Sequence, residues 1–235
     1  MAAIADIIKS VRTILDHNLS STELEDLTEV QTLDLDTLIR DSVRPAAMQL
    51  MQMVPVELAD VKNVQAQGRT EIRPDGSIVI QPIVPPVTIP IPDDYLRFVS
   101  CKTGEWDYPL TRLSEAGSRE HMRQYGEFGG LKATAHKPVA VIAPSSNGTE
   151  GGMEIILYGG RNGHQAEVSY IGMPYMDDTS IEIGVRLYDP LCYIIAALAC
   201  ECLKDTQKSQ YMIQTARSLM TPAERAAEQT IMTNT

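Results

Sequence analysis

Aromatic residues are scarce in this sequence of 235 residues, which contains one Trp, two Phe and nine Tyr. Aliphatic residues and the eleven Met must therefore supply most of any buried core. Met side chains adapt their shape easily, so a surplus of Met is also typical of surfaces that pack against partners. At this length the chain can bury one substantial core, or form one domain with a sizeable insertion.

Cysteine is sparse as well, and the sequence contains no CxxC pair. The four cysteines are Cys101, Cys192, Cys200 and Cys202. We expect them to be reduced and buried, consistent with synthesis in a cytosol. The first ten residues lack the basic start and long apolar run of a signal peptide. No apolar stretch approaches the roughly 20 residues that span a bilayer, so we expect an aqueous location and no membrane partner.

Positive charge is in the minority, because the formal net charge is −11. Lys and Arg are scattered and form no stripe, whereas binding to nucleic-acid phosphates needs them clustered. The acidic surplus is explained by solubility alone. An alternative is that the protein lines a DNA conduit, where like charge would let DNA slide past.

Recognisable catalytic and ligand-binding motifs are missing. The sequence has no Gly-x-Ser-x-Gly nucleophile elbow, and none of its four histidines has a partner at metal-ligand spacing. Two carboxylate pairs, Asp93-Asp94 and Asp177-Asp178, suit either a hard cation or the commoner turn and cap roles. We therefore expect no catalytic residue, no cofactor and no metal site.

Apolar residues recur at helical spacing near both ends of the chain. Asp189-Pro190 predicts a helix start, with Asp as N-cap and Pro in the first turn. In the middle of the chain, a polar helix is expected from Ser114, as N-cap, to Tyr125. The terminal helices are expected over about residues 4–17, 36–53, 189–202, 206–220 and 223–230.

Strand patterns occupy the middle of the chain. A hairpin is expected from Arg69 to Gln81, with its turn at Pro74-Asp75-Gly76. The glycine-rich residues 159–163 predict a second hairpin between the strands before and after them. Further strands are expected over residues 97–101, 139–143, 153–158 and 166–171.

These patterns predict an α+β fold, in which a helical bundle is built from the N- and C-terminal helices and carries an inserted small antiparallel β unit. The expected division is residues 1–65 for the N-terminal helices and 66–180 for the β-rich insertion. Residues 181–220 are then expected to complete the bundle, and residues 221–235 form a tail.

The segment from Pro92 to Ser100, which reads PDDYLRFVS and is followed by Trp106, resembles a family of phage proteins. It is similar to the head-to-tail connector proteins, also called adaptor or ring proteins, of crAss-like and related Bacteroidetes tailed phages. Other short segments agree with that family in their order along the chain, from residue 4 to about residue 220. They include residues 137–139, 153–158, 170–174 and 188–220.

This resemblance implies a structural virion protein with no enzymatic activity. Its subunits would form a homo-oligomeric ring beneath the portal protein, following the portal's twelve-fold symmetry, and would contact further neck-ring or tail proteins. DNA would pass through the channel without specific binding. The location implied is the head-tail neck of the virion.

The tail after Met220 matches no pattern of that family. We expect residues 221–235 to dock onto the portal or an adjacent subunit, with Ala226, Ile231 and Met232 as anchors. Three other interpretations stay open: another neck or tail-completion protein of a virion, a small hydrolase with an unrecognised site, and a cellular binding module.

Overall fold

The computed structural model describes residues 1–18, 29–67, 70–72, 78–80, 86–104, 106–145, 152–159 and 165–221. The chain divides into two compact units, each described by itself below. Unit 1 comprises Met1–Asp60 and Met173–Thr235, and unit 2 comprises Val61–Gly172. The boundaries of the β-rich insertion expected from the sequence lay after residues 65 and 180.

Unit 1 is mainly helical, and its segments come from both ends of the chain. Ala2 and Ala3 pair antiparallel with Ile181 and Ser180, which joins the two ends in a two-stranded sheet. Its elements are β1 (Ala2–Ala3), α1 (Ile4–Asn18), α2 (Glu29–Met53), the 3-10 helix η1 (Val56–Leu58), β11 (Ser180–Ile181), α4 (Val185–Cys202) and α5 (Thr206–Leu219).

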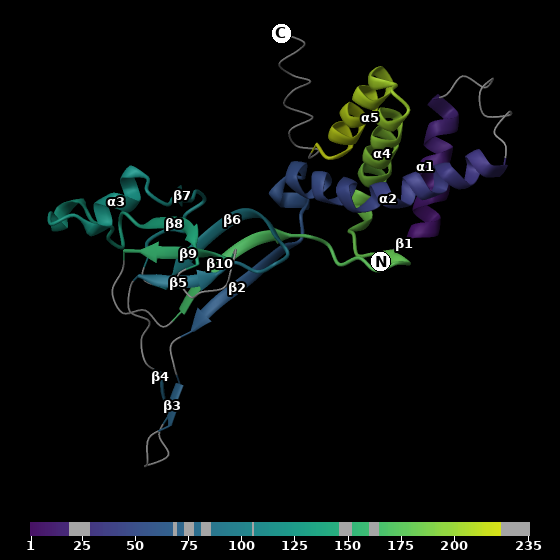
Figure 1. Cartoon of the computed structure of the whole chain (residues 1–235). Coiled ribbons are helices and arrows are strands. Elements are labelled where there is room, and N and C mark those ends of the chain that lie inside the picture. Colours follow the sequence, from purple (N-terminus) through teal and green to yellow (C-terminus); the bar gives the residue numbers. More distant parts are fainter. Residues whose placement is uncertain are drawn as a thin grey trace, which may run out of the picture. The chain divides into compact units, whose positions relative to one another are not determined.

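The core of unit 1 lies where these helices meet. Helix α4 contacts α1, α2 and α5, and Figure 1 shows α4 and α5 side by side while α2 runs across α4 and α1. The apolar face of each helix is buried, as the helical spacing requires. Side chains with no exposed surface include Ile7, Val11, Ile39, Val43, Leu50, Leu191, Ile194, Ile195 and Met212.

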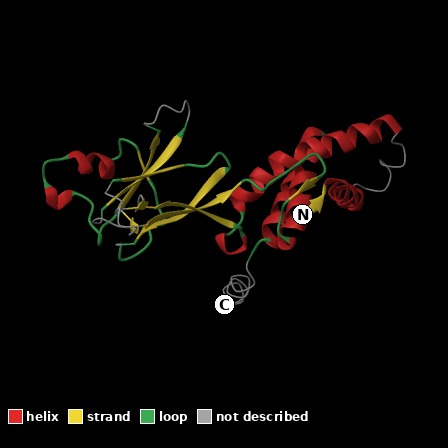
Figure 2. Ribbon diagram, turned by 90° about the horizontal axis from the view of Figure 1, so that it is seen from below, coloured by secondary structure: helices red, strands yellow, loops and turns green. Residues whose placement is uncertain are grey.

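Unit 2 contains nine strands in three sheets among its described residues. In Figure 2 these strands are yellow, and only short helical stretches interrupt them. The first sheet has the order β2-β10-β6, from β2 (Val61–Gln67), β10 (Gln165–Gly172) and β6 (Tyr95–Thr103). The second has the order β5-β9-β8-β7, from β5 (Val87–Pro90), β9 (Met153–Tyr158), β8 (Val139–Pro144) and β7 (Ser114–Glu115). The third pairs β3 (Thr70–Ile72) with β4 (Ile78–Ile80).

One apolar cluster holds the two larger sheets of unit 2 together. It takes side chains from both sheets together with Trp106, the chain's single Trp, which is buried. The buried members are Val87, Ile89, Cys101, Trp106, Ala140, Ile155, Leu157, Ala166 and Val168. Strands β9 and β10 therefore present alternate residues to a shared interior, as half-buried strands do.

The fold is α+β, but the architecture expected from the sequence is wrong. The middle of the chain forms three sheets instead of one small antiparallel unit, and the pairing of β7 with β8 is parallel. Helices are not limited to a terminal bundle, because α3 (Arg119–Tyr125) and the 3-10 helix η2 (Gly129–Leu131) lie among the strands. In unit 1, α2 crosses its neighbours (Figure 1) instead of running alongside them.

Two local expectations fail for identifiable reasons. Helix α4 begins at Val185, and Pro190 lies inside it, because the buried Leu187 extends the apolar face of the helix before Asp189. Residues 159–163 do not join a hairpin, since β9 and β10 belong to different sheets. The strands at 139–144, 153–158 and 165–172 are confirmed.

Candidate interaction surface

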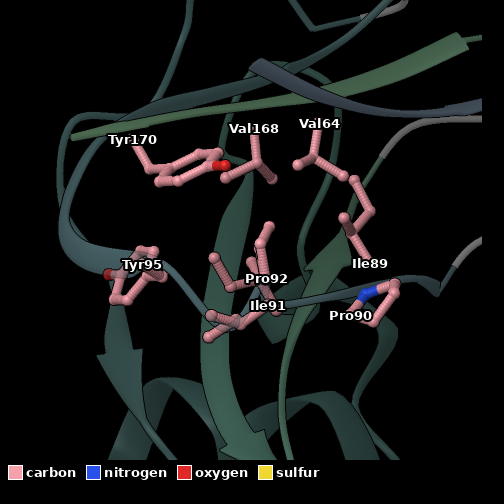
Figure 3. Close-up of a pocket in the computed structure, with 9 residues that line it drawn as sticks. Val64, Ile89, Pro90, Ile91, Pro92, Tyr95, Val168 and Tyr170 are labelled. Carbon is pink, nitrogen blue, oxygen red and sulfur yellow. The ribbon is translucent and has the colours of Figure 1, made fainter. Parts of the chain in front are cut away.

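The enclosed space between the two larger sheets of unit 2 is too small for a ligand. Its volume is about 10 Å³, which is at most enough for one water molecule. Figure 3 shows apolar side chains and the rings of Tyr95 and Tyr170 converging on it. The lining residues are Val64, Ile89, Pro90, Ile91, Pro92, Tyr95, Ile155, Val168 and Tyr170. Ligand pockets are typically about 300–1,000 Å³, so this space is a packing gap in the core.

Asp94, Lys62 and Tyr170 form a hydrogen-bonded polar cluster beside this gap, which we call the latch. Asp94 Oδ2 lies 2.6 Å from Lys62 Nζ, and Tyr170 Oη donates a hydrogen bond of 3.0 Å to Asp94 Oδ1. Burial acts to raise the pKa of Asp94, but the hydrogen bonds from Lys62 and Tyr170 outweigh it, so the pKa lies below its ordinary value. A Cβ at Gly172 would lie 2.6 Å from Asp94 Oδ2. The latch thus joins β2, β10 and the start of β6.

The most exposed apolar surface of unit 2 lies on α3 and η2. We call residues 119–131 the α3–η2 arm. Four large apolar side chains of the arm face solvent: Met122 is 59 % exposed, Tyr125 67 %, Phe128 77 % and Leu131 57 %. Neither α3 nor η2 has a buried residue. Large exposed apolar side chains that gather on one segment are typical of interaction sites in folded proteins.

Hydrogen bonds fix the amino-terminal turn of the arm. The hydroxyl of Ser118 is the N-cap of α3 and accepts from the backbone N–H of His121 at 3.4 Å. The backbone N–H of Gly117 donates to Nδ1 of His121 at 3.0 Å. Gly117 has a φ of 81°, a conformation that glycine adopts without steric cost.

The carboxyl-terminal end of α3 is hydrogen-bonded to neighbouring parts of unit 2. Gln124 Oε1 accepts from the backbone N–H of Ala133 at 2.9 Å, and the hydroxyls of Tyr125 and Tyr158 lie 3.2 Å apart. Burial raises the pKa of Tyr158, and the bond with Tyr125 raises it further. Gln124 and Tyr125 thus connect the arm to the rest of unit 2, whereas its large apolar side chains and its charged Arg119, Glu120 and Glu127 are exposed.

The chain just beyond the arm packs closely on the end of β9. Trp106 Nε1 donates to the carbonyl of Gly159, and Gly159 has a φ of 89°. A Cβ at Gly159 would lie 2.7 Å from the carbonyl oxygen of Thr134, closer than such contacts allow. Glycine at position 159 therefore lets the base of the arm approach the sheet.

Charge is distributed unequally between the units. Residues 61–172 carry 11 Lys or Arg and 12 Asp or Glu, whereas the rest of the chain carries 9 and 19. Within residues 119–137 the balance reverses, with four Lys or Arg against two Glu. The arm itself carries two Arg and two Glu, and the surplus comes from Lys132 and Lys137 just beyond it.

Unit 1 contains a hollow surface with apolar walls, which we call the α4 groove. Its volume is about 290 Å³. Val185, at its edge, is 93 % exposed. The groove is lined by Leu58, Val185, Arg186, Asp189, Pro190, Leu219 and Thr221.

The residues singled out in the sequence are mostly not brought together. Ala226, Ile231 and Met232 lie outside the described residues. His136 pairs with Asp107 on an exposed surface, and Asp177 accepts hydrogen bonds from Thr179 and Ser180, which lower its pKa to about 2. Asp177 therefore closes a turn, one of the two roles its sequence allowed.

Three cysteines are buried as expected, and one is not. Cys101, Cys192 and Cys200 are buried and free, whereas Cys202 is exposed at the end of α4. Burial raises the pKa of Cys101 and Cys192 to about 12, so these thiols stay protonated and unreactive.

The α3–η2 arm was not predicted from the sequence. A polar helix was expected from Ser114, but α3 begins at Arg119 with Ser118 as its N-cap. The available signal was the spacing of Met122, Tyr125, Phe128 and Leu131, each three residues from the next. That spacing marks a shared apolar side, but spacing alone does not say whether the side is buried.

In the described part of the chain, no group of three or more His, Cys, Asp or Glu side chains is placed to hold a metal ion. Among the same residues, no helix combines the length and apolar character that a bilayer crossing needs. No protein-family model and no curated protein matches the chain.

Proposed function

We propose that the chain is a structural subunit of the head-tail connector ring of a tailed bacteriophage, joining the portal to the tail and forming part of the DNA channel. The observation that carries this proposal is the α3–η2 arm. Four large apolar side chains of this short segment are exposed, which a subunit of a larger assembly explains better than a free-standing protein. The order of the short segments from residue 4 to residue 220 supplies the particular assembly, because it resembles that of connector proteins.

The charge of the protein agrees with a channel component. A net charge of −11 repels the phosphate backbone, so DNA would move past the subunit without binding to it. The partners proposed are copies of the chain in a ring that follows the portal's twelve-fold symmetry, the portal itself, and further neck-ring or tail proteins.

The tail after Met220 belongs to the same proposal. Residues 221–235 would dock onto the portal or an adjacent subunit through Ala226, Ile231 and Met232. Deleting residues 221–235 should abolish attachment to portal-bearing heads while the chain stays folded. Normal attachment by the truncated chain would exclude this role for the tail.

Light scattering of the chain alone, of the portal alone and of their mixture tests the proposal. We expect the mixture to contain a large complex of defined mass that neither component forms alone. A chain whose mass is unaffected by the portal would contradict the connector role. A complex with a tail protein in place of the portal would favour another neck or tail-completion protein.

A further inference from the structure

We infer that His121 makes the α3–η2 arm sensitive to pH: uptake of one proton by its imidazole ring releases the turn at Gly117, which fixes the amino-terminal end of the arm. The observation behind this inference is a chain of hydrogen bonds that uses both nitrogens of the ring. The inference goes beyond the connector role and does not depend on it, because it concerns a single copy of the chain.

The bond from Gly117 determines where the neutral ring carries its hydrogen. Nδ1 of His121 lies 3.0 Å from the backbone nitrogen of Gly117. A backbone N–H can only donate, so Nδ1 presents its lone pair, and a neutral imidazole then carries its hydrogen on Nε2. That nitrogen lies 3.3 Å from the hydroxyl oxygen of Tyr125, which accepts the hydrogen. Both ring nitrogens are therefore in use in the neutral form.

A second hydrogen on the ring removes the acceptor that Gly117 needs. It binds at Nδ1, the ring nitrogen that has a lone pair to share, and a doubly protonated imidazole has two donors and no acceptor. Two N–H groups would then face each other across 3.0 Å. Histidine side chains change their charge between about pH 5 and pH 8, so the bond from Gly117 is present in alkaline solution and is lost on acidification.

The ring is held more firmly than the turn. The rings of Tyr125 and Tyr158 have their centroids 5.3 Å and 6.0 Å from that of the His121 ring, within the range at which aromatic rings attract each other. Nε2 also keeps its hydrogen and its bond to Tyr125 in both charge states. Gly117 changes its backbone conformation at little steric cost. The turn therefore moves away while the charged ring stays.

The titratable groups around the ring are of other kinds. Of the strands that α3 contacts, β7 contributes Glu115 and β8 consists of residues that do not titrate. Strand β9 contributes Tyr158, whose pKa is raised by burial, so its hydroxyl stays protonated. Helix α3 itself carries Arg119, Glu120, Arg123 and Tyr125. None of these is a histidine, so a change at Gly117 between about pH 5 and pH 8 reports His121.

Only the amino-terminal end of the arm responds to the proton. The carboxyl-terminal end of α3 is held by the bonds of Gln124 with Ala133 and of Tyr125 with Tyr158, in which no histidine takes part. Acidification therefore loosens one end of the segment that carries the exposed apolar side chains and leaves the other end in place.

Nuclear magnetic resonance of the full-length, isotope-labelled chain tests the inference between about pH 8 and pH 5. Long-range proton–nitrogen spectra of the His121 ring should show the hydrogen of the neutral form on Nε2. The amide proton of Gly117 should shift upfield as His121 gains its second hydrogen, with the same midpoint, while the amide proton of Ala133 keeps its position. Hydrogen exchange at Gly117, corrected for the intrinsic effect of pH, should become about fivefold faster or more.

Two variants separate His121 from the other histidines. In His121→Gln the side chain at this position no longer titrates, so the pH-dependent shift of Gly117 should disappear. His136→Gln is the matched control, because His136 is also a histidine of unit 2 but pairs with Asp107, and the shift should remain in it. Circular dichroism checks that both variants fold, and the wild-type spectra decide the question if His121→Gln does not.

Three results would each overturn the inference: a Gly117 amide that stays in place while His121 titrates, a neutral ring with its hydrogen on Nδ1, and the same shift of Gly117 in His121→Gln. The portal takes no part in these experiments. Their failure would therefore leave the connector role standing, and failure of the connector role would leave their result unchanged.

Discussion

Asp94 shows how one carboxylate organises the first sheet of unit 2. It accepts hydrogen bonds from Lys62 and Tyr170, and it lies within the segment that resembles connector proteins. Trp106 is the chain's single Trp and is buried in the same unit. Its fluorescence therefore reports the unfolding of unit 2 separately from unit 1.

The pKa of Asp94 gives a pH-dependent prediction. The pKa of Asp94 is lower in the folded protein than in the unfolded chain, where it is about 3.9. The ionised carboxylate therefore stabilises the fold above about pH 3.9, and this stabilisation is lost as the pH falls through the folded pKa. Asp94→Asn should cost about 1 kcal/mol at pH 7 after allowance for solvent screening. The Asp94→Asn variant should also lose less stability than the wild type when the pH falls below about 4.

Urea denaturation followed by Trp106 fluorescence at neutral and acidic pH measures both effects. Asp93→Asn is the matched control, because Asp93 is adjacent, carries the same charge and is exposed. An Asp94→Asn protein with the same pH dependence as wild type would show that the latch does not stabilise unit 2.

Gly159 provides a second prediction, based on space and backbone conformation. In Gly159→Ala the new Cβ would meet the carbonyl of Thr134 at 2.7 Å, at a φ of 89°. We expect a loss of about 2–3 kcal/mol in the free energy of unfolding of unit 2. Gly117→Ala is the control, because Gly117 also has a positive φ but a Cβ there meets no atom within 4 Å.

Thermal or urea unfolding followed by Trp106 fluorescence compares the two variants. Gly117→Ala should cost about 1 kcal/mol, from backbone strain alone. Equal costs at both positions would mean that the approach of Thr134 contributes nothing.

At the scale of elements, α4 is the central helix of unit 1, because it contacts α1, α2 and α5. Leu191 lies in its middle and has no exposed surface. Leu191→Ala should lower the free energy of unfolding of unit 1 by about 3 kcal/mol, through lost burial and the cavity that remains. Leu203→Ala, just after the same helix and 59 % exposed, should cost less than about 0.5 kcal/mol.

Far-UV circular dichroism follows this unfolding, since most of the helical residues that the structure describes lie in unit 1. If Leu191→Ala costs no more stability than Leu203→Ala, the packing of Leu191 would not be what stabilises unit 1.

The elements that could be predicted are those whose apolar pattern is long or uninterrupted. The helix over residues 4–18 and the strand over 153–158 have such patterns, and both are present. Strand β2 was missed because VKNVQAQ has only two Val and one Ala among polar residues. Its place in the sheet depends on pairing with β10, which local sequence does not encode.

The candidate surface could not be predicted for a related reason. A spacing of three residues predicts one apolar side on residues 122–131 but does not distinguish a core side from an exposed one. The place of the arm in unit 2 depends on hydrogen bonds such as Gln124 with Ala133 and Tyr125 with Tyr158. Those bonds join residues up to 33 positions apart, beyond the range of any local pattern.

At the scale of the whole molecule, unit 2 is an insertion whose two ends meet. Strand β2 begins the unit and β10 ends it, and they pair antiparallel, with Val61 opposite Ile171. The chain therefore enters and leaves unit 2 at neighbouring positions. Ends that lie close together are typical of segments that fold independently within a larger protein.

This geometry predicts that residues 61–172 fold as an isolated fragment. The fragment keeps both strands that flank β10 and the whole apolar cluster around Trp106, so its cooperative unfolding should resemble that of unit 2 in the full chain. A fragment of residues 66–180, which follows the division expected from the sequence, is the matched comparison. It lacks most of β2 and leaves that edge of β10 unpaired, so it should be clearly less stable. Trp106 fluorescence during urea unfolding compares them, and an unfolded 61–172 fragment would mean that unit 2 depends on the helices of unit 1.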